Sequence, residues 1–415
     1  MSNIKKLLEG VEVEWKTLGE ITNILRGKRL TRNLLSANDK YPVFHGGLDP
    51  LGYYYNANRP ADTVMIINVG ASAGTVGYSS VDFWSSDGTY CIEQMAKLNN
   101  KFLYYFLLGE QYYLKSRVRV AGIPTLDAFV IEKLQIPIPY PNNLKKSLEI
   151  QQEIVRILDS FSMLTAELQA ELQARKSQYE YYRNQLLAYP MEESDQSSLR
   201  SNRSATSIQN SDNSIQPLST LNPPTGNSVL QPRGKVEWKV LEEVVEIKRG
   251  KRLIKNQLEK TGKYAVYQNC MIPLGYYHKN NVIADTTFII SAGSAGEIGY
   301  SDVDFWAADD VYYFVTKNDL KSRFLYHFLI TQQQKIYSQV RRSSVPRLSK
   351  TAFEKLLIPI PSLEEQEHIV SILDKFDALT TSLTEGLPKE IELRQKQYEY
   401  YRNMLLSFPK NNIKA

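Results

Sequence analysis

The sequence predicts an α+β chain made of two tandem copies of one unit, in which a mostly-β globular head is followed by a long helix. The first observation is repetition: the heptapeptide QYEYYRN occupies residues 178–184 and returns at 397–403. Each heptapeptide lies near the end of an apolar stripe with helical spacing, and each stripe follows short β-branched and aromatic runs. Between the copies, residues 191–237 contain no aromatic side chain.

Further segments recur in the same order in both copies, as expected for a tandem duplication. They are VEWK (13–16 and 236–239), RGKRL (26–30 and 249–253), LGYY (51–54 and 274–277), VDFW (81–84 and 303–306) and IPIP (136–139 and 358–361). We therefore divide the chain into a first head (1–143), a first long helix (144–190), a linker (191–235), a second head (236–361) and a second long helix (362–415). The linker is rich in Ser, Asn and Pro and has too little apolar surface to fold alone.

Each head is expected to contain mainly short strands. The runs DTVMIINV (62–69) and DTTFIISA (285–292) are β-branched and aromatic and are bounded by Gly, Asn and Pro. Short helices are expected near 102–113 and 324–337. The motif IPIP at the end of each head should be extended, because its prolines exclude a helix.

An apolar stripe marks each long helix, and its steps of three and four residues indicate a coiled coil with a stutter. The stripes are Ile154, Ile157, Phe161, Leu164, Leu168, Leu172, Arg175, Tyr179, Tyr182 and Leu186, and Ile369, Ile372, Phe376, Leu379, Leu383, Leu387, Ile391, Tyr398, Tyr401 and Leu405. Each helix would run roughly 40 residues, or about 60 Å. Antiparallel packing with pseudo-two-fold symmetry would bury both stripes and hold one head at each end.

The repeated heptapeptide then has two interpretations, which can both hold. The stripe tyrosines fill the seam between the helices. The outer face, with Tyr181, Arg183, Tyr400 and Arg402, is a candidate surface for a protein partner.

Composition places the chain among soluble globular proteins, with 42% hydrophobic and 23% charged residues. The net charge of +5 permits a nucleic-acid partner without arguing for one. The sequence contains neither a signal peptide nor an apolar stretch of membrane-span length. The two cysteines, Cys91 and Cys270, are too few for a disulfide framework or a four-ligand zinc site. We expect a cytoplasmic protein with no membrane association.

A duplicated enzyme should repeat its catalytic groups, and the histidines do not repeat. His45, His278, His327 and His368 lie opposite Gln268, Tyr55, Tyr105 and Glu153. Walker A, GxSxG, HExxH and CxxC motifs are absent from the sequence. Asp82/Asp304 and Asp87/Asp309 do repeat, but without a metal-ligand cluster we expect turn or hydrogen-bonding roles. The sequence therefore predicts no enzyme, no catalytic residue and no metal site.

Basic side chains recur in the heads at positions suited to DNA phosphates. Arg26, Lys28 and Arg29 surround Gly27 in a predicted turn, and Arg249, Lys251 and Arg252 surround Gly250 in the second copy. The alternative is a solvated basic loop, and both interpretations stay open. A second basic group contains Lys115, Arg117 and Arg119 in the first head, and it is loosely matched by Arg341, Arg342 and Arg347 in the second.

A variable segment inside a constant frame suggests base recognition. PVFHGGLDPLGYY (42–54) matches AVYQNCMIPLGYY (265–277), but His45 is replaced by Gln268 and the next residue by Asn269. Gln and Asn can bond adenine edges, and His can bond guanine. Two heads that recognise different sequences would show this pattern, and drift of an unselected loop is the alternative.

These motifs resemble the specificity (S) subunit of type I restriction–modification enzymes. The resemblance lies in YPVFHGGLDPLGYY, in GASAGTVGY (70–78) and GSAGEIGY (293–300), and in FWSSD and FWAAD, which are similar to target recognition domains. IPIPSLEEQEHIVSILDKF (358–376) and IPIPYPNNLKKSLEIQQEIVRILDSF (136–161) are similar to the junction with the conserved helix. One departure is that SVPRL (344–348) lacks the glycine of GIPTL (122–126), which affects the expected geometry of the second loop.

The resemblance implies that each head binds one half of a split site in double-stranded DNA. It implies that the helices set the spacing and dock two methyltransferase subunits, which bring S-adenosylmethionine; restriction subunits, which use ATP, can join. Two major-groove readers lie roughly 34–36 Å apart per DNA turn, a distance that a helix of about 60 Å can span.

Two other functions stay open. One is a DNA-binding scaffold or regulator that works without a methyltransferase. The other is a coiled-coil interaction module whose heads bind proteins.

Overall fold

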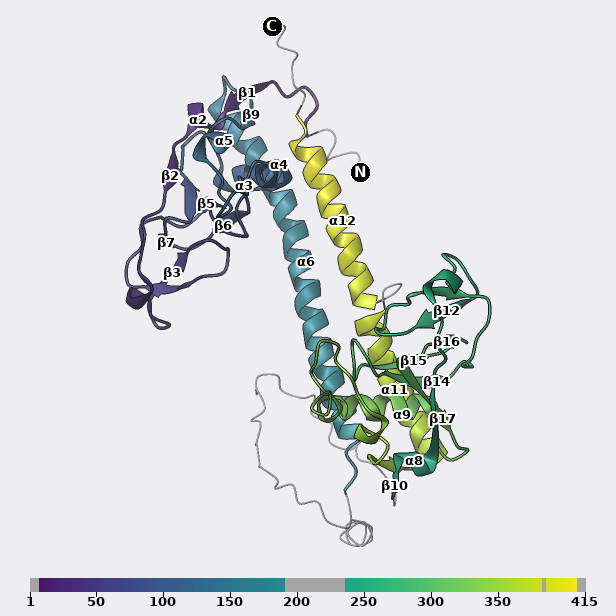
Figure 1. Ribbon diagram of the computed structural model, residues 1–415. Helices are drawn as coiled ribbons and strands as arrows, with labels where there is room; N and C mark the ends of the chain where they lie inside the picture. The colour runs from purple at the N-terminus through teal and green to yellow at the C-terminus, as the bar shows by residue number, and fades with distance from the viewer. Residues whose placement is uncertain (1–6, 191–235, 383–385, 409–415) are drawn as a thin grey trace. The chain divides into compact units, whose positions relative to one another are not determined.

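The computed structural model describes residues 7–190, 236–382 and 386–408, so the predicted linker lies outside the described residues. The chain divides into two compact units, Met1–Ala170 with Lys389–Ala415, and Glu171–Pro388. Each unit therefore contains one head, the start of the helix that follows it, and the end of the helix of the other copy (Figure 1).

Both heads have the same sheet topology, which confirms the predicted duplicated α+β fold. The sheet orders are β2-β8-β5-β6, β4-β3-β7 and β1-β9 in the first head, and β11-β17-β14-β15, β13-β12-β16 and β10-β18 in the second. The strands of the first head are β1 (Val13–Thr17), β2 (Ile24–Arg26), β3 (Tyr41–Phe44), β4 (Gly52–Tyr54), β5 (Thr63–Ile67), β6 (Val76–Ser79), β7 (Trp84–Ser85), β8 (Thr89–Ile92) and β9 (Gln135–Pro139). Those of the second are β10 (Glu237–Val240), β11 (Val245–Arg249), β12 (Tyr264–Tyr267), β13 (Gly275–Tyr277), β14 (Thr286–Ile290), β15 (Ile298–Ser301), β16 (Trp306–Ala307), β17 (Val311–Thr316) and β18 (Leu357–Ile360).

The two predicted β-branched runs form the central strands β5 and β14, in which every residue is buried. A strand covered on both faces has a continuous apolar sequence, as these runs do. One face is covered by the predicted short helices, each of which continues after a break into a second short helix. They are α3 (Asn100–Gly109) and α4 (Gln111–Ser116), and α9 (Ser322–Thr331) and α10 (Gln333–Tyr337). The other short elements are α2 (Leu18–Ile21), η1 (Arg32–Leu34), α5 (Ala128–Glu132), α8 (Leu241–Val244), η2 (Lys255–Gln257) and η3 (Lys350–Ala352).

The repeated motifs VEWK and IPIP pair with each other in both heads. In the first head Trp15 lies opposite Pro137, and in the second Trp238 lies opposite Pro359. Both ladders have only two strands, so each proline can turn its missing N–H away from the partner strand. This ladder joins the beginning of each head to the start of the helix that follows.

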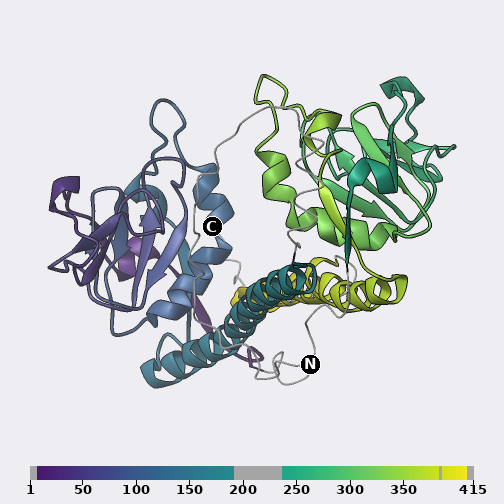
Figure 2. The ribbon, with the colours of Figure 1, turned by 90° about the horizontal axis from the view of Figure 1, so that it is seen from below.

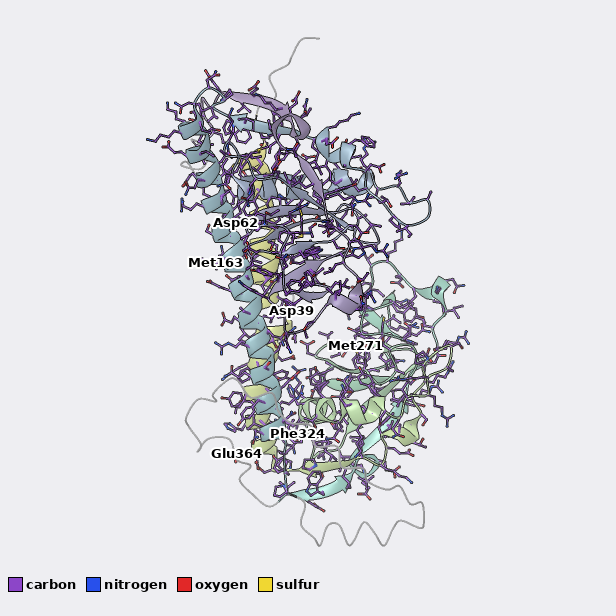
Figure 3. All side chains as sticks on the ribbon, turned by 90° about the vertical axis from the view of Figure 1, so that its left-hand side faces the viewer. Asp39, Asp62, Met163, Met271, Phe324 and Glu364 are labelled. Atoms are coloured by element: carbon purple, nitrogen blue, oxygen red, sulfur yellow. The ribbon has the colours of Figure 1, made fainter. Side chains whose placement is uncertain are left out.

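The first long helix is α6 (Leu144–Leu186), and a side chain caps its N-terminus. The Asn143 carboxamide oxygen accepts a hydrogen bond from the backbone N–H of Lys146 at 3.1 Å. In the second copy the Ser362 hydroxyl does the same for Glu365 at 3.2 Å. Both are preferred capping residues, and each follows closely on the end of a head. On the outer side of α6, Met163 points into solvent with 63% of its surface exposed (Figure 3).

The prediction of a continuous second long helix was wrong, because the structure describes two segments, α11 (Leu363–Thr381) and α12 (Gly386–Leu406). Gly386 has a φ of +79°, in the left-handed region that favours glycine. A Cβ at this position would lie 2.8 Å from the carbonyl oxygens of Ala378 and Leu379, so the backbone lies directly against the end of α11. Pro388 follows within the first turn of α12, where its missing N–H is tolerated.

Within the second unit, α6 and α11 run antiparallel, as predicted. The hydroxyl of Tyr189, just after α6, donates a hydrogen bond to Glu365 at the start of α11. Seven residues earlier, Tyr182 contacts Phe376 farther along α11, with ring centroids 5.5 Å apart. In the first unit, Phe161 of α6 stacks on Tyr401 of α12 at 5.0 Å. Tyr182 and Tyr401, which belong to the apolar stripes, therefore lie in a helix–helix seam.

The ends of the long helices also enter the cores of the heads, which the sequence analysis did not foresee. Leu405, Leu406 and Phe408 belong to the core of the first head, where Phe408 meets Phe102 edge to face. A matching group of Tyr179, Leu186, Leu187 and Tyr189 belongs to the core of the second head. That core includes Phe324, a fully buried residue of α9 (Figure 3).

A carboxylate on the long helix fixes each head to its helix. Asp159 accepts hydrogen bonds from the Tyr105 hydroxyl and from Lys101 Nζ, the latter at 2.7 Å. Its counterpart Asp374 accepts hydrogen bonds from Arg323 Nε at 2.7 Å and from His327 Nε2 at 2.8 Å. We call these two groups the head–helix clamps.

The clamp of the second unit encloses a histidine that is completely buried. His327 Nδ1 lies 3.2 Å from the Tyr179 hydroxyl, so a neutral ring that donates from Nε2 and accepts at Nδ1 satisfies both contacts. Burial lowers the pKa of His327, against the opposing effect of Asp374. Burial alone would raise the pKa of Asp374, but hydrogen bonds from His327 and Arg323 lower it.

We predict that His327 makes the stability of the second unit depend on pH. Because its folded-state pKa lies below the ordinary value of 6.5, the unfolded chain binds a proton more readily, and the free energy of unfolding should fall as the pH drops through that value. His327→Tyr, which introduces the residue of the first copy, should remove this dependence. Urea unfolding between about pH 7.5 and about pH 5.5 measures it. His368→Gln, at an exposed histidine, should keep the wild-type slope, and equal slopes in the wild type and His327→Tyr would contradict the prediction.

Candidate nucleic-acid interface

The basic loop of the first head is held rigidly against the neighbouring strand. After β2, the backbone N–H of Gly27 donates to the Thr89 carbonyl at 3.0 Å and that of Lys28 donates to the Ser85 carbonyl at 2.8 Å. The Trp84 indole N–H donates to the Lys28 carbonyl at 2.8 Å. A Cβ on Gly27 would lie 1.9 Å from the Ser86 carbonyl oxygen, so only glycine allows this approach. The side chains of Arg26, Lys28 and Arg29 remain exposed.

The second head repeats this arrangement bond for bond. Gly250 donates to the Val311 carbonyl and Lys251 to the Ala307 carbonyl, both at 2.9 Å. The Trp306 indole donates to the Lys251 carbonyl at 2.9 Å. The basic side chains Arg249, Lys251 and Arg252 are again exposed. The recurrence of both the hydrogen-bonded backbone and the exposed cations favours a specific role over that of an unconstrained solvated loop.

The variable segment follows the strand that borders this loop. His45 comes directly after β3, is exposed, and has its Nδ1 3.3 Å from Asp87 Oδ1. Gln268 and Asn269 follow β12, with Gln268 half-buried and Asn269 exposed. The Asn269 carbonyl accepts a hydrogen bond from Ser294 N at 2.9 Å, which ties this segment to the glycine-containing loop after β14.

A third loop, between α4 and α5 in the first head, is tied to the same end of the sheet. Arg119 and Thr125 exchange two backbone hydrogen bonds of 2.9 and 3.0 Å, which close a small hairpin. Gly70 N donates to the Pro124 carbonyl at 2.9 Å and so attaches this hairpin to the loop after β5. In the second head Arg341 and Arg347 form the same pair, and Gly293 N donates to the Pro346 carbonyl.

The predicted DNA-binding residues are thus brought together at one end of each head. β2 and β5 end there and β8 begins there, because Arg26 pairs with Tyr90 and Ile67 with Thr89. Arg119 is partly neutralised by Asp127, whose carboxylate lies 2.9 Å away. Arg117, Arg341, Arg342 and Arg347 are exposed.

The carboxylates of the repeated aspartates Asp82 and Asp304 have the hydrogen-bonding role that was predicted for them. Asp82 Oδ1 accepts a hydrogen bond from Ala61 N, and Asp304 Oδ1 accepts one from Ala284 N, each at 2.8 Å. Asp87 contacts His45, and the Asp309 carbonyl accepts a hydrogen bond from Arg249 Nε at 2.7 Å. No group of three or more His, Cys, Asp or Glu side chains suited to a metal ion is found among the described residues.

The predicted partner surface on the helices is exposed only in part. Tyr181 and Tyr400 are 49% and 60% exposed, whereas Arg183 and Arg402 are half-buried. The two guanidinium groups lie over the rings of Tyr179 and Tyr398, at 5.4 and 5.7 Å from the ring centroids. The tyrosines are therefore available to a partner, while the arginines mainly cover the seam.

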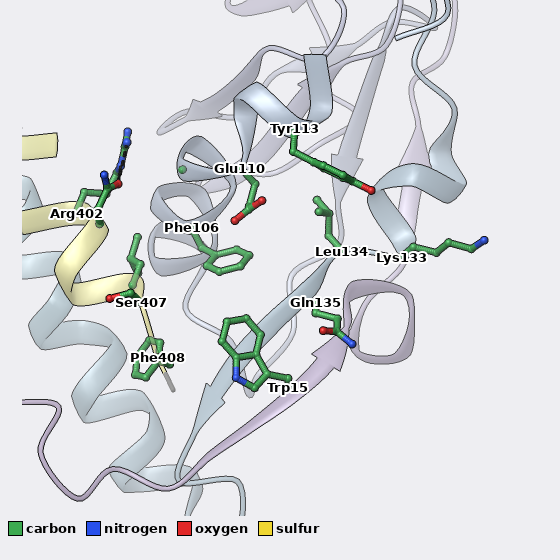
Figure 4. Close-up of a pocket in the computed structure, with 13 residues that line it drawn as sticks. Trp15, Phe106, Glu110, Tyr113, Lys133, Leu134, Gln135, Arg402, Ser407 and Phe408 are labelled. Atoms are coloured by element: carbon green, nitrogen blue, oxygen red, sulfur yellow. Dashed lines mark hydrogen bonds between the residues drawn. The ribbon is translucent and has the colours of Figure 1, made fainter. Parts of the chain in front are cut away.

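Arg402 also lines a cavity of about 600 Å³ in the first unit (Figure 4). Its walls come from β1, α3, α4, the start of β9, the end of α12 and the residues that follow α3 and α12, and they include Trp15, Phe106, Glu110 and Phe408. The lining mixes aromatic faces with both signs of charge. It lies beside the head–helix junction and contains none of the predicted DNA-binding residues.

Comparison with known proteins agrees with this architecture. The type I restriction modification DNA specificity domain matches residues 10–175 and 234–393, once in each copy. The chain belongs to the family of type I restriction–modification specificity proteins. Among its relatives, the type I restriction enzyme EcoR124I/EcoR124II specificity subunit of Escherichia coli is 32% identical, covering 99% of this chain and 98% of the relative. A putative type I restriction enzyme specificity subunit of Haemophilus influenzae is 30% identical over 98% of both chains.

A solved structure shows the same fold for this specificity chain. The S subunit of a type I restriction–modification system from M. genitalium aligns with a TM-score of 0.64 at 20% identity and covers 97% of this chain and 98% of the other. Among the described helices of the specificity chain, none combines the length and hydropathy of a membrane span.

Some residues that support the loops of the candidate interface were not predicted from the sequence. Trp84 and Trp306 support the basic loops, and Thr125 closes the third loop. The two tryptophans lie in the repeated motif VDFW, so their recurrence was visible. Their hydrogen bonds to carbonyls 55 and 56 residues away were not visible, because pattern and propensity do not specify contacts so distant in sequence.

We predict that Gly27→Ala destabilises the specificity chain, because the new methyl group would overlap the Ser86 carbonyl. Gly47→Ala is the matched control, since a Cβ at Gly47 has no atom within 4 Å and lies in the neighbouring loop. Thermal unfolding of the two variants measures the difference, and we expect a cost of about 2 kcal/mol for Gly27→Ala alone. Equal unfolding midpoints would contradict the close approach.

Proposed function

We propose that this chain is the non-catalytic DNA specificity subunit of a type I restriction–modification system. In this proposal each head recognises one half of a bipartite site in double-stranded DNA. The long helices set the spacing of the halves and dock two methyltransferase subunits. Methyl transfer from S-adenosylmethionine and ATP-dependent restriction belong to those partner subunits, and a cytoplasmic location is part of the same proposal.

One observation supports the proposal above the others: the same pinned loops recur in two heads whose recognition segments differ. The two RGKR loops make the same backbone hydrogen bonds, between residues whose equivalents in the two heads are 222 or 223 positions apart in the sequence. Inside that frame His45 is exchanged for Gln268, and Gly46 for Asn269. A protein that binds phosphates alike in both halves but distinguishes their bases needs this combination.

The exposed heptapeptide tyrosines are the proposed contact for the methyltransferase subunits. Tyr181 and Tyr400 occupy equivalent positions, one in each unit, which gives each chain two similar docking sites. Large amphipathic rings are favoured in protein interfaces, and each is supported edge to face by the neighbouring Tyr182 or Tyr401.

The experiment that tests the function is methylation mapping in a host that expresses this chain with a type I methyltransferase subunit. A new split adenine-methylated motif supports the proposal and reveals both half-sites. A stable complex that produces no motif contradicts it and favours a scaffold or regulator. Tyr181→Ala with Tyr400→Ala should prevent copurification of the methyltransferase while DNA binding persists.

We predict that Lys28→Ala with Arg29→Ala weakens binding to all DNA sequences alike. Loss of two phosphate contacts should reduce the slope of log affinity against log salt by about 1 to 2, since each contact contributes about 0.9. Titration of labelled duplexes at several salt concentrations measures this. Lys145→Ala with Lys146→Ala, which removes the same charge from the exposed start of α6, is the control. A slope equal to that of the wild type would exclude these side chains from the interface.

We predict that Gln268→Ala with Asn269→Ala changes base preference in one half-site only. Both residues belong to the second head, and the first head has its own variable segment at His45. Methylation mapping of the variant measures the change. A shift in both half-sites would be inconsistent with one head for each half.

A further inference from the structure

The third loop of each head places apolar side chains in solvent among arginines. In the first head Val120 is 80% and Ile123 71% exposed, and in the second head Val345 is 45% exposed. Each loop projects from the body of its own head (Figure 2). Isolated exposed apolar residues are ordinary, but a repeated apolar tip on a fixed loop beside basic residues calls for a partner.

The third loop of each head has a fixed backbone conformation. Each is closed by the exchanged backbone hydrogen bonds of Arg119 with Thr125, or of Arg341 with Arg347. Each is also fastened at its base, since Leu126 N donates to the Asn68 carbonyl at 2.9 Å and Leu348 N to the Ser291 carbonyl at 2.8 Å. Ordering such a loop on binding costs little entropy, which favours a tip used in recognition.

The two loops share a frame and differ in content. RVAGIPT (119–125) corresponds to RRSSVPR (341–347). Ile123 and Val345 occupy the same position before a proline, but Val120 is matched by Arg342 and Thr125 by Arg347. Gly122 has a φ of +80°. Among the described residues other than glycine, positive φ angles occur at Asp62, Tyr140 and Asp285. Ser344, the counterpart of Gly122, therefore does not adopt the left-handed conformation of that glycine. The two backbone hydrogen bonds that close the loop are present in both heads, although the residues at the tip differ.

We propose that Ile123 and Val345 contact DNA bases, and that each loop places its apolar side chain in a groove of the DNA. This rests on the proposed function. Apolar side chains recognise the thymine methyl group in the major groove, and they also wedge between base steps in the minor groove. The neighbouring Arg117 in the first head and Arg341, Arg342 and Arg347 in the second supply the positive charge that draws such a tip to the backbone.

The charge distribution favours nucleic acid over a protein partner at these tips. In the second head three exposed arginines surround Val345 within the loop of seven residues. In the first head Asp127 partly neutralises the charge of Arg119. There the loop exposes two apolar side chains, Val120 and Ile123. The first loop therefore depends more on apolar contact with the bases, and the second more on charge.

The test uses the full chain with its methyltransferase subunit and begins with the wild-type methylation motif. Ile123→Ala and Val345→Ala are then mapped separately, and binding is measured on duplexes with single base-pair changes in each half-site. We expect each variant to lose discrimination at one or two positions, roughly tenfold, in opposite half-sites. The salt dependence should stay as in the wild type, because no charge is removed.

Val81→Ala is the control, since Val81 is 54% exposed in the turn between β6 and β7, at the other end of the sheet. All three substitutions are at exposed positions, and equal unfolding midpoints verify that the fold is intact. If the wild type yields a split motif but both loop variants keep every base preference and the full affinity, the inference is overturned while the proposed function stands. If the wild type yields no motif, the proposed function itself fails.

Discussion

The structure depends on one exchange: the core of each head is completed by the end of the helix that belongs to the other copy. Leu405 and Phe408 lie in the first core, and Leu186 and Tyr189 lie in the second. Burial of each such side chain contributes about 2 kcal/mol, so a head without the returning helix would lose a large part of its stability. The repeated heptapeptide follows from this exchange, because each copy must fit the same kind of head.

Much of the fold was predictable because the duplication gives two independent views of each element. The strands β5 and β14 and the coiled-coil stripes follow from local sequence pattern. The break before α12 was not predicted, although Gly386 and Pro388 are ordinary signals for it. The pairing of VEWK with IPIP and the entry of Phe408 into a distant core depend on tertiary contacts, which local pattern does not specify.

At the candidate interface, the side chains are predictions from the sequence, and the structure shows the backbone that holds their loops. Arg26, His45 and Arg119 are far apart in the chain, and only strand pairing brings their loops to one end of the sheet. Backbone hydrogen bonds and tightly placed glycines hold these loops, so the frame does not depend on the side chains that face outward. His45 and Gln268 can therefore occupy equivalent places without disturbing the fold.

The head–helix clamps join two different heads to the helices through the same helix residue. The helix contributes an aspartate in both copies, Asp159 and Asp374, whereas the head contributes Lys101 and Tyr105 in one case and Arg323 and His327 in the other. A cation and a hydrogen-bond donor four residues apart on a short helix satisfy the same carboxylate. The junction therefore tolerates different side chains on the head, provided that one cation and one further hydrogen-bond donor face the carboxylate of the helix.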